Sequence, residues 1–202
     1  MFDDLLRALK DRLFHPTAIV VGRWLSPNAL SLIAFAMGAA AAIAAANREY
    51  GAALACWLVN RLLDGLDGSV ARATGRQTDF GGYLDIILDF TVYAALPLGL
   101  VYGSGDPKVA LAGVALVGSF FINAASWMYL AAILERRGQG VQATGERTTI
   151  TMPPGLVAGA ETVVLYTLFL LLPGHLALLF MLMTAGVAIN IVQRLVWALR
   201  HL

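Results

Sequence analysis

The sequence predicts an all-α protein embedded in a lipid bilayer, and its composition, its long apolar stretches and the placement of its charges all indicate this class. Of the 202 residues, 59% are hydrophobic and 13% are charged, whereas soluble domains average about 45–50% and about 25%. The mean hydropathy is +0.73. With a net charge of +1, this composition excludes a disordered chain and a basic nucleic-acid-binding surface, so we expect no nucleic-acid partner. The single cysteine, Cys56, cannot form an intrachain disulfide.

Six stretches are long and apolar enough to form transmembrane helices, which need about 20 residues because lipid offers no partner for free backbone groups. Three stretches carry no charge, the fifth is interrupted only by Glu161, and the second and third contain aspartates. The predicted spans are residues 29–47, 50–70, 80–102, 109–134, 156–172 and 176–193. We therefore expect one polytopic membrane domain over residues 26–202.

The first 25 residues have a different pattern. Phe2, Leu5, Leu6, Leu9 and Leu13 recur at helical spacing, and charged residues occupy the opposite face. This pattern predicts an amphipathic helix that lies in the membrane interface, followed by a segment that leads into the first span. A helix that packs on a soluble partner is the alternative. The acidic residues in this segment do not fit a signal peptide.

The distribution of lysine and arginine predicts the orientation. With six spans, eleven of the 14 Lys and Arg residues fall on the side that holds both termini. Only Arg48 and Lys108 fall on the opposite side, and Arg61 lies inside the second span. By the positive-inside rule, we expect a multi-pass plasma-membrane protein with both termini in the cytoplasm.

Four aspartates lie inside the second and third predicted spans, where an ionised carboxylate costs several kcal/mol and indicates a functional site. Asp64 and Asp67 are three residues apart, and Asp85 and Asp89 are four apart, so each pair shares one helical face. Two helices joined by a short loop pack antiparallel, so the pairs can face each other. Four such carboxylates would repel one another without cations, and they suit two divalent ions such as Mg²⁺, Mn²⁺ or Ca²⁺.

Glycines and one arginine surround these acids. Gly65, Gly68, Gly81 and Gly82 lie beside them, although each glycine costs a helix about 1 kcal/mol relative to alanine. Close helix packing is one interpretation, and access of a substrate to the backbone is the other, which we favour. Arg72 adds a fork for phosphate oxygens, or else its side chain reaches the lipid headgroups. Together these residues indicate a two-metal site at the cytoplasmic end of the bundle that handles a phosphate ester.

The spacing of these residues, D-x-x-D-G-x-x-A-R followed after eight residues by G-x-x-x-D-x-x-x-D, resembles the motif of the CDP-alcohol phosphotransferase family. It occupies 26 residues and is matched at every position by Asp64, Asp67, Gly68, Ala71, Arg72, Gly81, Asp85 and Asp89. The Pro27-Asn28 pair before the first span is also similar to the family pattern. Members of the family displace CMP from a CDP-linked lipid or alcohol with the hydroxyl of a second alcohol, and they generally work as homodimers.

The resemblance implies a role for each matched residue. Asp64, Asp67 and Asp85 would hold two Mg²⁺ or Mn²⁺ ions, with Asp64 and Asp85 touching both. Asp89 would complete the shell of the second ion and act as the general base toward the acceptor hydroxyl. The CDP-lipid would be contacted by Asn28, Gly68, Arg72 and Thr78.

The length of the chain and its number of predicted spans indicate which donor and acceptor substrates to expect. Family members of this length mostly transfer a phosphatidyl group from CDP-diacylglycerol to a small polar alcohol such as glycerol 3-phosphate, serine, inositol or inositol phosphate. The run 145–149 is loosely similar to the G-K-x-K-T run of phosphatidylglycerophosphate synthases, but Glu146 and Thr148 stand at its lysine positions. Arg147 would bind an acceptor phosphate, or it would only contribute to the positive-inside pattern. Glu161 would line the acceptor pocket, pair with Arg61 or lie at the interface.

Two other functions fit the composition less well. A cation transporter would need polar residues through the whole bilayer, but residues 50–59 and 90–102 carry no charge. The alternative within the family is an enzyme that transfers a phospho-alcohol from a soluble CDP-alcohol to diacylglycerol. Family members of that type usually have more spans.

Overall fold

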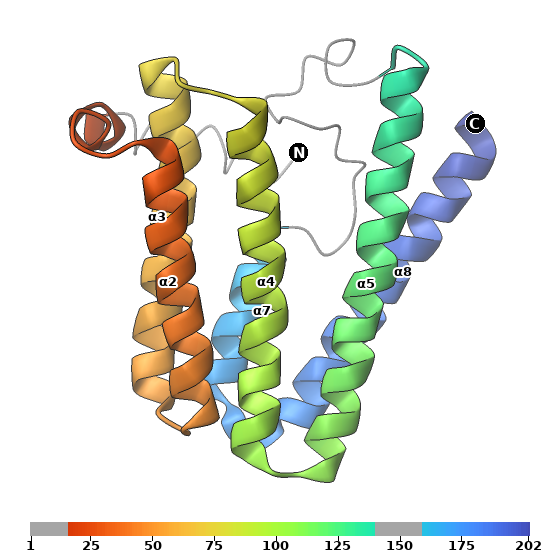
Figure 1. Ribbon diagram of the computed structural model, residues 1–202. Helices are drawn as coiled ribbons and strands as arrows, with labels where there is room; N and C mark the ends of the chain where they lie inside the picture. Colours follow the sequence, from red (N-terminus) through yellow and green to blue (C-terminus); the bar gives the residue numbers. More distant parts are fainter. Residues whose placement is uncertain (1–15, 140–158) are drawn as a thin grey trace. The chain divides into compact units, whose positions relative to one another are not determined.

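The computed structural model describes residues 16–139 and 159–202, and every regular element in these ranges is a helix (Figure 1). Residues 16–21 are helical. The elements that follow are α2 (Pro27–Ala46), α3 (Tyr50–Thr74), α4 (Asp79–Ser104), α5 (Pro107–Arg136), α7 (Gly159–Leu171), the short 3₁₀ helix η1 (Pro173–His175) and α8 (Leu176–His201). The predicted all-α class is therefore confirmed for the described part of the chain.

Four of these segments are long and apolar enough to cross a membrane: Pro27–Ala46, Asp79–Ser104, Pro107–Arg136 and Pro173–His201. Helix α3 has 25 residues but carries an arginine and two aspartates in its interior, and α7 has 13 residues. The layout of six spans therefore stays a prediction. The expected interfacial helix of residues 1–13 lies outside the described residues.

A tight turn joins α3 to α4 and sets the depth of the residues on both helices. Helix α3 ends at Gly75, whose φ of +63° is left-handed and suits glycine. Helix α4 begins after Thr78, whose side-chain hydroxyl accepts a hydrogen bond from the backbone N–H of Gly81 at 3.0 Å. Because so few residues separate the helices, the last turns of α3 lie near the first turns of α4.

The described helices divide into two compact units. The first contains α2, α3, α4 and residues 166–173. Within it, α2 packs against both α3 and α4, and these three helices run beside one another in Figure 1. The contact between α2 and α4 depends on small residues, since a Cβ on Gly99 or Gly103 would overlap the backbone of Ala42 or Ala45.

The second unit contains α5, α8 and the first residues of α7. Helix α5 packs against α8. Arg194 of α8, which the sequence places just beyond the last predicted span, lies instead inside a helix that continues to His201. Its side chain is only 6% exposed and donates to the Asn123 Oδ1 atom at 2.9 Å and the Ser126 Oγ atom at 3.3 Å. These bonds between α5 and α8 stabilise part of a buried charge, whose Nε atom is buried without a hydrogen-bond partner among the described residues.

Candidate active site

Three of the four predicted aspartates meet in one cluster in the first unit. Asp64 and Asp67 come from α3 and Asp85 comes from α4, and each offers a carboxylate oxygen within 4.8 Å of the others. The three-residue spacing on α3 places its two aspartates on one face, and the short turn to α4 brings Asp85 to the same depth. The site therefore presents a converging set of hard oxygen ligands.

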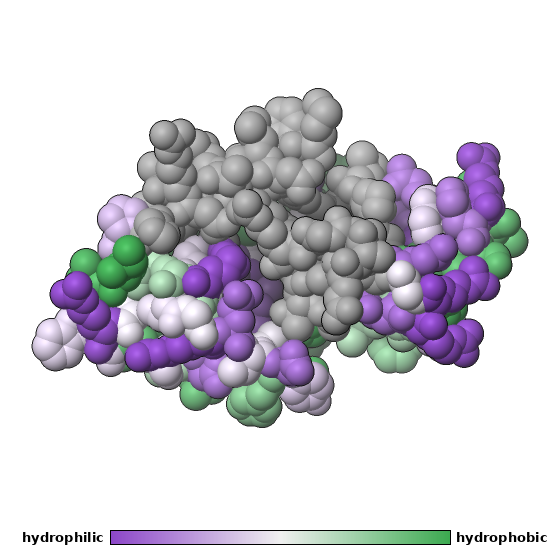
Figure 2. All heavy atoms as spheres, turned by 90° about the horizontal axis from the view of Figure 1, so that it is seen from above, coloured by the Kyte–Doolittle hydropathy of each residue, from purple (hydrophilic) through white to green (hydrophobic). Residues whose placement is uncertain are grey.

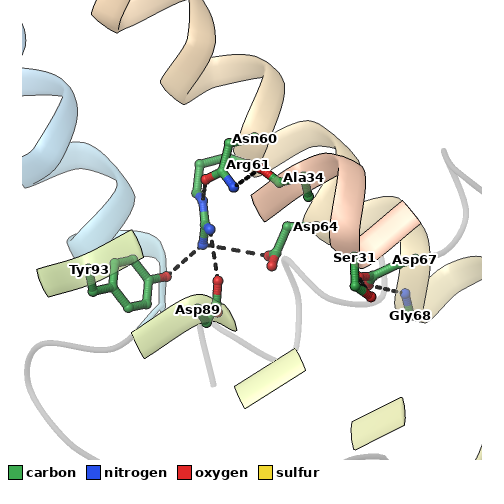
Figure 3. Close-up of polar contacts among 9 residues, drawn as sticks. All are labelled: Ser31, Ala34, Asn60, Arg61, Asp64, Asp67, Gly68, Asp89 and Tyr93. Carbon is green, nitrogen blue, oxygen red and sulfur yellow. Dashed lines mark hydrogen bonds and ion pairs between the residues drawn. The ribbon is translucent and has the colours of Figure 1, made fainter. Parts of the chain in front are cut away.

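Asp67 is the most fixed member of this cluster, with only 5% of its surface exposed. Its Oδ2 atom accepts a hydrogen bond of 2.6 Å from the Ser31 hydroxyl on α2, and its Oδ1 atom accepts one of 2.5 Å from the backbone N–H of Gly68 (Figure 3). Hydrogen bonds to an ionised group hold that group in a defined orientation. Helix α2, which carries no acidic residue, thus takes part in the site through Ser31.

Asp89 lies outside this group of three and forms an ion pair with Arg61 instead. Its Oδ1 atom is 2.8 Å from the Nη2 atom of Arg61, whose Nη1 atom is 3.6 Å from the Asp64 Oδ2 atom. Figure 3 shows the guanidinium between the two carboxylates. The Arg61 side chain is only 9% exposed. Arg61 therefore links α3 to α4 and supplies one positive charge to the aspartate site.

Hydrogen bonds and aromatic rings fix the position of the Arg61 side chain. Its Nε atom donates to the Asn60 Oδ1 atom and its Nη1 atom donates to the Tyr93 hydroxyl, both at 2.7 Å. The guanidinium carbon also lies 4.8 Å from the centre of the Trp57 ring and 5.0 Å from that of Tyr93. Tyr166 supports both rings, since it stacks on Trp57 and donates to the Tyr93 carbonyl at 2.6 Å.

Neither Arg61 nor Ser31 was predicted as a site residue. From the sequence, Arg61 is a charge within the second span and an alternative partner of Glu161, although its position three residues before Asp64 places both on one helical face. That spacing was a usable signal. Ser31 gave none, because a serine in an alanine-rich helix is unremarkable without knowledge of what packs against it.

A small pocket opens between the helices of this unit, with the carboxylates at its polar side and apolar side chains at its walls. Residues of all three helices line it: Ser31, Ala34, Phe35, Asn60, Asp64, Asp85, Leu88, Asp89 and Val92. Asp64, Asp85 and Asp89 therefore line one pocket.

The residues predicted to contact the CDP-lipid form two pairs near the α3–α4 turn. A Cβ on Gly81 would lie 3.1 Å from both the Asn28 Oδ1 and the Thr78 Oγ1 atoms, so these two side chains converge over Gly81. A Cβ on Gly68 would lie 3.2 Å from the Arg72 Nη1 atom. Because glycine has no Cβ, these side chains can lie close to the backbone at both positions. Around this turn the exposed residues are mostly hydrophilic, as the view of this end in Figure 2 shows.

Neither residue predicted to bind the acceptor belongs to the described part of the first unit. Arg147 lies outside the described residues. Glu161 belongs to the first turn of α7, in the second unit. Both acceptor contacts therefore stay predictions, as does a pairing of Glu161 with Arg61.

Comparison with known proteins gives concordant results. The family model for CDP-alcohol phosphatidyltransferase matches residues 24–192. The chain is 37% identical over 153 residues to the inner membrane protein YnjF of Escherichia coli, covering 76% of this chain and 73% of that protein. It is 31% identical over 121 residues to the archaetidylinositol phosphate synthase of Pyrococcus horikoshii, covering 60% and 61%.

The fold is shared with a solved enzyme. The crystal structure of Mycobacterium tuberculosis phosphatidylinositol phosphate synthase with CDP-DAG bound matches with a TM-score of 0.71 at 21% identity, over 91% of this chain and 92% of that one. A structure of the same synthase in complex with manganese and citrate matches with a TM-score of 0.70. The four apolar helices and the inner-membrane relative identify an integral membrane protein. With a family model that covers most of its length, the chain belongs to the CDP-alcohol phosphatidyltransferase family and is a transferase.

Proposed function

We propose that this enzyme transfers the phosphatidyl group of CDP-diacylglycerol, or of a similar CDP-lipid, to the hydroxyl of a small polar alcohol and releases CMP. The observation that carries the proposal is that Asp64, Asp67 and Asp85 of the motif converge, and that Asp89 lines the same pocket as Asp64 and Asp85. The donor is supported by the CDP-DAG bound to the synthase that shares the fold. A polar alcohol acceptor is supported by the archaetidylinositol phosphate synthase relative.

The donor atoms of the site fit two Mg²⁺ or Mn²⁺ ions. All four side chains offer carboxylate oxygens, which both ions prefer, and Arg61 balances only one of the four negative charges. Asp64, Asp67 and Asp85 would hold the first ion, and Asp64, Asp85 and Asp89 would hold the second. When bound, the ions supply Lewis-acid polarisation of the attacked phosphorus and neutralise charge on the departing CMP.

The protein's own residues bind the donor and orient the carboxylates. Ser31 and the Gly68 N–H fix the Asp67 carboxylate. Asn28 and Thr78 over Gly81, together with Arg72 over Gly68, would present polar atoms to the cytidine diphosphate near the α3–α4 turn. Arg72 can bind phosphate oxygens in a bidentate manner.

Asp89 would receive the proton of the acceptor hydroxyl. The proton would arrive at the Oδ2 atom, because Oδ1 accepts the hydrogen bond from Arg61. As the acceptor oxygen forms its bond to the β-phosphorus of the CDP-lipid, the bond from that phosphorus to the oxygen bridging to CMP breaks. The apolar walls of the pocket, which include Leu88 and Val92, limit the access of water that would compete with the alcohol.

We also propose the orientation and assembly that the sequence predicts. Both termini and the active site would face the cytoplasm of the plasma membrane, where CDP-lipid headgroups and polar alcohols are available, and the enzyme would act as a homodimer. The excess of Lys and Arg on the side of the α3–α4 turn supports this orientation.

The decisive experiment is an assay of the purified full-length protein in detergent, with labelled CDP-diacylglycerol, Mg²⁺ and a panel that contains inositol phosphate, glycerol 3-phosphate, serine and inositol. We expect CMP release that depends on one of these alcohols and is lost on exhaustive chelation. Asp64→Asn serves as the inactive control. Full turnover after chelation would contradict the metal mechanism. Release of CMP only from a soluble CDP-alcohol with diacylglycerol would establish the alternative reaction.

A further inference from the structure

The guanidinium of Arg61 contacts two of the carboxylates that the second metal ion would need. From this placement we infer that Arg61 is a positioning residue which makes the two metal positions unequal. It engages the Asp89 carboxylate in an ion pair, so that the second ion binds tightly only together with the CDP-lipid. This inference rests on the two-metal function proposed above.

The first metal position is already assembled. Carboxylate oxygens of Asp64, Asp67 and Asp85 lie within 4.8 Å of one another, and hydrogen bonds fix Asp67. A preformed set of ligands loses little conformational freedom on binding, so the first ion should bind tightly even without substrate.

The second position is not assembled in the same way. Asp89 is outside the group of three, and its Oδ1 atom is 2.8 Å from the Arg61 Nη2 atom. The same guanidinium is 3.6 Å from the Asp64 Oδ2 atom. An ion that recruits Asp89 must therefore share this carboxylate with Arg61 and lie close to a positive charge.

Arg61 cannot readily move aside. Each of its three nitrogens has an acceptor, from Asn60, Tyr93, Asp64 or Asp89, and two aromatic rings lie against the guanidinium. An arginine keeps its charge under all physiological conditions. The positive charge of Arg61 is thus a fixed part of the site. The diphosphate of a CDP-lipid brings negative charge that offsets this cation, and it adds oxygen ligands for the second ion.

The test measures Mn²⁺ binding by electron paramagnetic resonance on the purified full-length protein in detergent, with and without CDP-diacylglycerol. We expect one tight site without the lipid and a second, weaker site that the lipid strengthens. In Arg61→Gln the second site should tighten about tenfold or more without lipid. Removal of a cation a few ångströms from a divalent ion is worth more than the 1.4 kcal/mol that a factor of ten requires.

Two further variants separate charge from fold. Arg61→Lys retains the charge, so its second site should stay weak, although turnover should fall because lysine cannot hold Asp89, Asp64 and Tyr93 together. Arg200→Gln removes an exposed positive charge from the second unit and should leave both sites unchanged. The tight first site reports in each variant that the carboxylate cluster has folded.

The outcomes are distinct. An unchanged second site in Arg61→Gln would refute the role of Arg61, as would two equally tight sites in the unmodified protein without lipid. A uniform loss of affinity at both sites would show that Arg61 only supports the fold. If the unmodified protein binds a single Mn²⁺ even with saturating CDP-diacylglycerol, the two-metal function itself is wrong.

Discussion

Replacement of Ser31 by alanine tests whether α2 shapes the metal site. The Ser31 hydroxyl donates to the Asp67 Oδ2 atom at 2.6 Å in a buried position, and Asp67 is one of three converging carboxylates. A hydrogen bond to a charged group contributes about 1.5–3 kcal/mol, which corresponds to about 10- to 150-fold in an equilibrium constant. Loss of an outer partner of a metal ligand typically costs about 10–100-fold in metal affinity. The two independent ranges agree.

We therefore expect Ser31→Ala to raise the Mg²⁺ concentration for half-maximal CMP release by about 10–100-fold. Turnover at saturating Mg²⁺ should be largely retained, because all four carboxylates remain. Ser119→Ala is the matched control, since the Ser119 hydroxyl donates to the backbone carbonyl of Leu116 in α5 at 2.7 Å. An unchanged Mg²⁺ requirement in Ser31→Ala would refute the idea that α2 orients Asp67. A loss of turnover that excess Mg²⁺ does not restore would assign Ser31 a different role.

Three other substitutions test separate parts of the site and the fold. Asp64→Asn and Asp85→Asn should each abolish CMP release, because each carboxylate would contact both ions, and substantial activity in either would refute the bridging assignment. Asp89→Asn should reduce turnover by about 10²–10⁴-fold, as loss of a general base does, while CDP-lipid binding measured on the same protein is largely retained. A parallel loss of binding and turnover would make Asp89 a metal ligand only. Gly99→Ala should lower the melting temperature in detergent, since the new Cβ would overlap the Ala42 backbone and overpacking costs about 1–3 kcal/mol; Gly118→Ala, where a Cβ meets nothing within 4 Å, should not.

The helical class and the convergence of three aspartates could be predicted because both follow from local spacing. Apolar stretches of sufficient length define the helices, and intervals of three and four residues define the acidic faces of α3 and α4. Asn28 and Thr78 approach each other over Gly81, and their role in binding the CDP-lipid stays a prediction. Capping by Thr78 and the left-handed Gly75 explain why the turn between α3 and α4 is short.

The partners of the aspartates could not be predicted, because they depend on how the helices are rotated against one another. Ser31 and Asp67 are 36 residues apart, and Arg61 and Asp89 are 28 apart. No local pattern states which face of the alanine-rich α2 meets α3. The predicted site of four aspartates did not include Arg61, which contacts both Asp64 and Asp89 in this structure.

The position of Arg61 also bears on how the chain enters the membrane during synthesis. As a predicted span, helix α3 would leave water with Asp64 and Asp67 in its interior, at a considerable cost for each isolated charge. Arg61 lies on the same face as Asp64, so this helix would bring a partner for one of its own acids into the bilayer. Asp89 becomes available to Arg61 as soon as α4 has been made, before any residue of α5 or α8 exists. If α3 spans the bilayer as the sequence predicts, the Arg61 charge would therefore also ease the insertion of the helix that carries it.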